Sequence, residues 1–251
     1  MSAGPRVCAF CGRDGKMTQE HVWPTSIIKR LAGKRASYSE RVDSLFWSDM
    51  TIGDVCASCN GGPLSALDVY GAAMFDRYFA QHVIDDAPVA FDYDFDMLAR
   101  WLLKLSYNSA RVVGSDDVRL GAYRDWIRGA TTARPQDFSI AVDLVLPSES
   151  EASDPWIPAT NRLCRVQTPD DVGYWCTVRL VAINSYYFWI LMQDIPDNEI
   201  HTPDALAMIS LIRGVGLDPD GTSALLTGSG ARTASAHEDW ARVMDDRGML
   251  P

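Results

Sequence analysis

Residues 8–11 read CAFC and residues 56–59 read CASC, and these two stretches decide how the first part of the chain folds. Zinc prefers four tetrahedral ligands, and two Cys-x-x-Cys pairs supply four thiolates. The start of the chain, residues 1–13, is too polar for a secretory signal, so we expect a reducing, cytoplasmic setting in which such pairs bind metal. We therefore predict one structural zinc ion on Cys8, Cys11, Cys56 and Cys59, in preference to redox dithiols.

Further polar residues stand between and after the cysteine pairs. Glu20 and His21 are adjacent in the long interval, Asn60 follows the second pair directly, and Asp68 comes eight residues later. Pro63 suits the first turn of a helix, which would carry Asp68. Singly, each residue has an ordinary explanation: a surface pair, an asparagine that caps a turn, and a solvated helical acid. Their occurrence together, in this order around two cysteine pairs, favours a joint functional role over the separate ordinary explanations.

The order Cys-x2-Cys, Glu-His-x-x-Pro, Cys-x2-Cys-Asn and then an acid on a helix resembles the HNH endonucleases of the His-Me finger group. The resemblance spans residues 8–75. It implies a zinc-bound, treble-clef-like ββα module at residues 1–79 and an enzyme that hydrolyses phosphodiester bonds of DNA. RNA is the alternative substrate.

The resemblance also implies a role for each polar residue. His21 would be the general base, because a neutral imidazole near pH 7 can take a proton from water. Glu20 and Asp68 would hold a catalytic Mg2+ or Mn2+, since hard cations prefer carboxylate oxygens. Asn60 would shape the His-bearing segment through hydrogen bonds. The family often has Asp or His at the position of Glu20 and His or Asn at that of Asp68, and Ser65 is an alternative ligand on the same helix face.

A second hypothesis is that the module still binds structural zinc but is catalytically inactive. In this case its role is to bind protein or nucleic acid. The net charge of -10 argues against a chain that coats nucleic acid over its whole surface. Residues 1–60 hold eight basic and six acidic side chains, so a polyanion would bind there in preference to the acidic remainder. The run Lys29–Arg35 is the densest basic segment, although charge alone favours a solvated helix end as its explanation.

The remainder, residues 80–251, predicts an α+β region with an antiparallel sheet. We expect it to position substrate, to sense a partner or to form a homo-oligomer. No stretch approaches the roughly 20 apolar residues of a membrane span. Cys164 and Cys176 are expected to be ordinary buried thiols. The periodicity predicts helices from Pro63 and over 96–111, 121–129, 205–213 and 237–246. It also predicts strands over 138–146, 174–183 and 186–192. A turn at Asn184-Ser185 is expected to join the last two strands.

Overall fold

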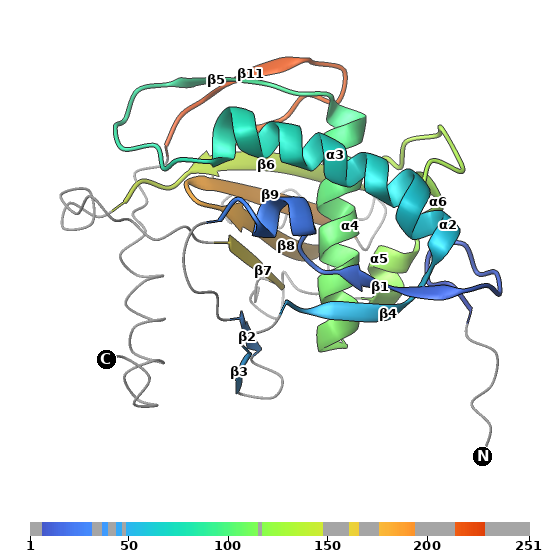
Figure 1. Cartoon of the computed structure of the whole chain (residues 1–251). Helices are drawn as coiled ribbons and strands as arrows, with labels where there is room; N and C mark the ends of the chain where they lie inside the picture. Colours follow the sequence, from blue (N-terminus) through green and yellow to red (C-terminus); the bar gives the residue numbers. More distant parts are fainter. Residues whose placement is uncertain are drawn as a thin grey trace.

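The structure is a computed structural model that mixes helices with antiparallel sheets, so the chain is an α+β protein (Figure 1). It describes residues 7–31, 37–39, 44–46, 49–114, 117–147, 161–165, 176–193 and 214–228.

An antiparallel pair of strands begins the described chain. Strand β1 (Met17–His21) pairs with β4 (Thr51–Cys56), and the register shifts between Thr18 and Glu20. Such a bulge places two residues against one and turns the side chains that follow. The segment between these strands contains α1 (Thr25–Ile28) and a short pair, β2 (Ser37–Ser39) and β3 (Ser44–Phe46).

A long helical run follows β4 directly. It consists of α2 (Ala57–Cys59), the wider turns of η1 (Asn60–Leu64), α3 (Ser65–Met74) and η2 (Phe75–Phe79). Gly62 has non-helical dihedral angles of -112° and -108°, and Pro63 follows it, so the run bends there. The helix predicted from Pro63 is confirmed by α3.

Helix α4 (Phe95–Val113) is the central helix of the fold (Figure 1). Asp94 accepts a hydrogen bond from the backbone of Met97 at 3.0 Å and caps its start, and Gly114 ends it in the left-handed conformation, with φ 77°. Where α4 meets α3, Gly71 leaves room for the Trp101 ring. The helix predicted over 96–111 is confirmed, and the apolar stripe along it is fully buried: Leu98, Trp101, Leu102 and Leu105.

Five antiparallel strands form the main sheet, in the order β10 (Val215–Gly216), β6 (Phe138–Leu144), β9 (Tyr186–Gln193), β8 (Cys176–Ile183) and β7 (Asn161–Arg165). The predicted turn is confirmed: Ile183 pairs with Tyr186, and Asn184 adopts a positive φ of 49°. Beside the sheet, β5 (Val89–Asp92) pairs with β11 (Ser223–Leu226).

The helix predicted over 121–129 differs from the structure. Two short helices take its place, α5 (Asp117–Gly121) and α6 (Arg124–Ile127), because the chain turns between them. The helices predicted over 205–213 and 237–246 lie outside the described residues, and so does the side chain of Cys164. The Cys176 thiol is buried, as expected. Within the described ranges, no helix has both the length and the apolar character that crossing a bilayer demands.

Candidate active site

The four cysteines of the two pairs converge on one point. Their Sγ atoms all lie within 4.8 Å of one another, and those of Cys11 and Cys56 are 3.7 Å apart. Zinc–sulfur bonds of about 2.3 Å in a tetrahedron put the sulfurs about 3.8 Å apart. The group is therefore suited to hold a metal ion such as zinc.

Local backbone geometry brings the first pair to the second. Gly12 has a positive φ of 67° and donates its backbone N–H to the Cys8 carbonyl at 2.8 Å, which closes the first turn. The backbone N–H of Cys56 points at the Cys8 sulfur, 3.4 Å away. Burial opposes ionisation of the Cys56 thiol, but hydrogen bonds with the Ser58 hydroxyl and the Cys59 backbone lower its pKa to about 6, whereas burial and the neighbouring sulfurs raise the pKa of Cys59. A thiolate is the form that binds metal.

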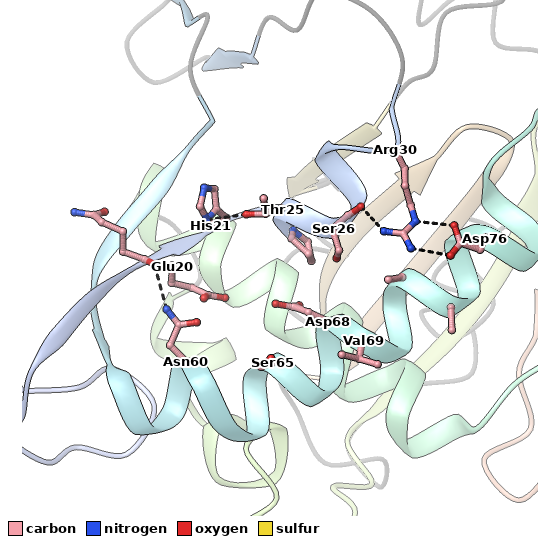
Figure 2. Close-up of a pocket in the computed structure, with 14 residues that line it drawn as sticks. Glu20, His21, Thr25, Ser26, Arg30, Asn60, Ser65, Asp68, Val69 and Asp76 are labelled. Atoms are coloured by element: carbon pink, nitrogen blue, oxygen red, sulfur yellow. Dashed lines mark hydrogen bonds and ion pairs between the residues drawn. The ribbon is translucent and has the colours of Figure 1, made fainter.

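The polar residues singled out in the sequence line one open cleft of about 570 Å³. Glu20 and His21 reach it from β1, Asn60 from the start of η1, and Asp68 from α3 (Figure 2). Ser65, the alternative ligand, lies on the same wall. The fold thus brings together residues that are separated by up to 48 positions in the chain.

Asn60 ties the helical run to the strand that carries the candidate base. Its side-chain nitrogen donates to the Thr18 hydroxyl at 2.9 Å and to the Gln19 carbonyl at 3.1 Å. Both acceptors lie where the register between β1 and β4 shifts, immediately before Glu20. The side chain thus holds the strand in the shape that directs Glu20 and His21 toward the cleft.

The His21 ring is accessible from the cleft, because 34% of its side chain is exposed. Its Nδ1 lies 3.2 Å from the Thr25 hydroxyl, and its Nε2 lies 3.9 Å from an Asp49 carboxylate oxygen. If Nδ1–H donates to Thr25, Nε2 keeps a free lone pair. Asp49 would then stabilise the positive charge that forms when the ring takes a proton.

The Glu20 and Asp68 carboxylates point toward each other across the cleft floor (Figure 2). A residue that the sequence analysis did not select lies between them. The Nζ of Lys104 is 2.7 Å from Glu20 Oε1 and 2.6 Å from each oxygen of Asp68. The Lys104 side chain is 0% exposed, so this ammonium lies inside the protein behind the cleft wall. Burial raises the pKa of Asp68, and Lys104 counteracts part of that rise.

Lys104 belongs to a polar stripe along α4. Asn108 donates to Glu20 Oε1 at 3.3 Å, and Arg111 donates to Asp54 at 2.6 Å and to Asn108 at 2.7 Å. These residues are four and three positions apart, which places them on one helix face. Lys104 and Asn108, four positions apart on a helix with a buried apolar stripe, were the one signal in the sequence that could have indicated this contact.

Arg30 stands at the far end of the cleft. Two of its nitrogens donate to the Asp76 carboxylate, at 2.6 and 2.8 Å, and a third donates to the Ser26 carbonyl at 2.7 Å (Figure 2). A guanidinium has five N–H groups, so two remain for a ligand. Asp76 lies eight residues beyond Asp68, about 12 Å along the helical run. The cleft therefore has a cationic group two helical turns from its carboxylates.

Comparison of the chain with family models, curated proteins and solved structures finds no match in any of the three.

Proposed function

We propose that the chain is an HNH-type endonuclease that hydrolyses phosphodiester bonds of DNA, with His21 as the general base. The observation that carries the proposal is the common cleft: an accessible imidazole, two converging carboxylates and a strand-shaping asparagine line one open space. The β1–β4 pair and the helical run after it supply the order of a ββα module, and the four cysteines adjoin it. We propose that they hold zinc in a structural role.

The chemistry proposed for His21 is proton abstraction from water. Nε2 takes the proton, the water oxygen bonds to phosphorus, and the P–O bond to the leaving oxygen breaks with its electron pair remaining on that oxygen. Thr25 orients the ring through Nδ1, and Asp49 stabilises the imidazolium. The leaving oxygen then takes a proton from solvent.

Arg30 suits a substrate with more than one phosphate. Its two remaining N–H groups would contact a phosphate beside the one that reacts, because the cleft extends about two helical turns from Asp68. That length favours a polynucleotide over a mononucleotide. DNA is the proposed substrate and RNA the alternative, and we propose that the acidic C-terminal region binds a partner or a second copy of the chain.

The HNH resemblance also implies a divalent Mg2+ or Mn2+ on Glu20 and Asp68, where it would act as a Lewis acid on the phosphate. The residues do not fit an ion between the two carboxylates. Both oxygens of Asp68 accept hydrogen bonds from Lys104, and Glu20 Oε1 forms an ion pair with the same ammonium, which occupies the space between the two carboxylates. The steps above therefore rest on the protein's own residues.

Cleavage of supercoiled plasmid tests the proposal. The zinc-loaded protein is assayed with DNA and, in parallel, with single- and double-stranded RNA, each with Mg2+ and after removal of divalent ions. We expect cleavage that His21→Ala abolishes and His82→Ala, a histidine outside the cleft, preserves. Equal cleavage by both variants, or binding without cleavage in every buffer, would favour the inactive zinc module.

A further inference from the structure

Carboxylate oxygens from two residues surround the ammonium group of Lys104. A protonated lysine has three N–H donors and no acceptor. Two of them go to the oxygens of Asp68 at 2.6 Å, and Oε1 of Glu20 lies in ion-pair contact 2.7 Å from Nζ. Charge-assisted hydrogen bonds of this length are the strong ones. Lys104 thus bridges the same two side chains that a divalent ion would bridge.

The Lys104 side chain is fully buried, and α4 is held on both sides of it. Trp101, one turn earlier, packs against the backbone of α3 at Gly71. Asn108, one turn later, bonds to Glu20 and to Arg111. Since both neighbouring turns are held, the α4 backbone keeps Lys104 directed at the two carboxylates.

A bridging metal ion and Lys104 would compete for one position. Mg2+ binds oxygen at about 2.0 to 2.1 Å, so an ion shared by Glu20 and Asp68 would lie close against Nζ. Two cations at that separation in a buried site repel each other strongly. With Lys104 present, the carboxylate pair retains one net negative charge in place of two.

We infer that Lys104 is the resident cation of this site: it takes the bridging position between Glu20 and Asp68 and excludes a divalent metal ion from it. The consequence for the reaction rests on the proposed function: cleavage would proceed without Mg2+ or Mn2+. Lys104 touches carboxylates and no substrate, so it is a positioning residue. It also makes the site dependent on α4, which lies beyond residues 1–79.

Mn2+ binding to the zinc-loaded full chain tests the inference, because free aqueous Mn2+ gives an electron paramagnetic resonance signal that disappears on binding. We expect no uptake at this site by the wild type. Lys104→Met removes the ammonium while keeping a long side chain, and we expect it to bind one Mn2+ per chain at least about tenfold more tightly than the wild type. The double variant Lys104→Met/Asp68→Asn should lose that ion.

Two results would overturn the inference. One is uptake of an Mn2+ ion by the wild type that Asp68→Asn abolishes. The other is a folded Lys104→Met variant that gains no ion. Should Lys104→Met fail to fold, as circular dichroism would reveal, the wild type against Asp68→Asn decides: equal Mn2+ binding by the two supports the inference.

The nuclease assay separates this inference from the proposed function. Cleavage that continues after divalent ions are removed supports both. Cleavage only with added Mg2+ overturns the inference and leaves the proposed nuclease standing. If no buffer gives cleavage, the proposed function fails, and Mn2+ binding still decides whether Lys104 holds the bridging position.

Discussion

Replacing Gly71 with alanine should separate α3 from α4 at the point that supports the candidate site. A Cβ on Gly71 would lie 2.3 Å from Cε2 and 2.5 Å from Nε1 of the Trp101 ring. Ordinary contacts to a Cβ begin near 3.4 Å, so the two helices would have to move apart by about 1 Å. The Trp101 ring is fully buried, which leaves it little freedom to rotate away.

The expected loss of stability follows from two opposing effects. Overpacking of this kind destabilises by about 3 kcal/mol at the upper end, and alanine in a helix recovers about 1 kcal/mol relative to glycine. The net loss of about 2 kcal/mol should lower the melting temperature by about 4 to 8 °C for a chain of this size. A shift of about 1 Å would also stretch the 2.6 Å contacts between Lys104 and Asp68, which lie one turn away on the same two helices.

Thermal unfolding followed by circular dichroism measures this loss, with Gly61→Ala as the matched control. A Cβ on Gly61 meets no atom within 4 Å, so that variant should unfold at or slightly above the wild-type temperature. The variant Gly71→Ala/Trp101→Phe has a smaller ring and should recover part of the loss. If Gly71→Ala melts with the wild type, α3 and α4 do not meet as closely as described, and the placement of Lys104 loses its support.

Three further predictions concern the metal-binding cysteines, the bulge and the division of the chain. The wild type should contain one zinc per chain by elemental analysis; Cys59→Ala should lose it, whereas Cys176→Ala, outside the cluster, should keep it. Asn60→Asp should reduce activity and stability more than Asn60→Ala, because a carboxylate would face the Gln19 carbonyl. Denaturant unfolding should show that Asn60→Asp lowers the free energy of unfolding by about 1 to 2 kcal/mol or more. Equal losses in the two variants would contradict this. A fragment of residues 1–79 should lack a cooperative unfolding transition, since Glu20 would be left without Lys104; a sharp transition would show that the module folds alone.

The sequence predicted those parts of the fold that depend on local pattern. The β8–β9 hairpin follows from two apolar runs around Asn184-Ser185, and α4 follows from leucines and a tryptophan at helical spacing. In both cases a few neighbouring residues determine the geometry. The convergence of the four cysteines joins positions 45 residues apart, and it was predictable because one tetrahedral zinc ion requires the four ligands that two pairs supply.

The parts that the sequence did not predict depend on contacts across long intervals. Lys104 is 84 residues from Glu20 and 36 from Asp68, and no local pattern specifies which carboxylate a buried lysine meets. The strand predicted over 186–192 differs in this respect, because its continuous apolar run is enough to place it in the core. Phe188 is fully buried and lies edge-on to Phe79, with ring centroids 5.6 Å apart.

Helix α4 connects the cleft both to the cysteine cluster and to the main sheet, so the geometry of the candidate site depends on both. Toward the cysteines, Tyr107 donates to the Ala9 carbonyl at 3.3 Å and packs edge-on against Phe10. Toward the sheet, the Ser106 carbonyl accepts a hydrogen bond from Arg179 of β8 at 3.4 Å. Both residues adjoin the turn that carries Lys104. Loss of metal from the cysteines, or a displacement of β8, should therefore weaken the contacts of Lys104 with Glu20 and Asp68, although neither the cysteines nor β8 touches these three residues.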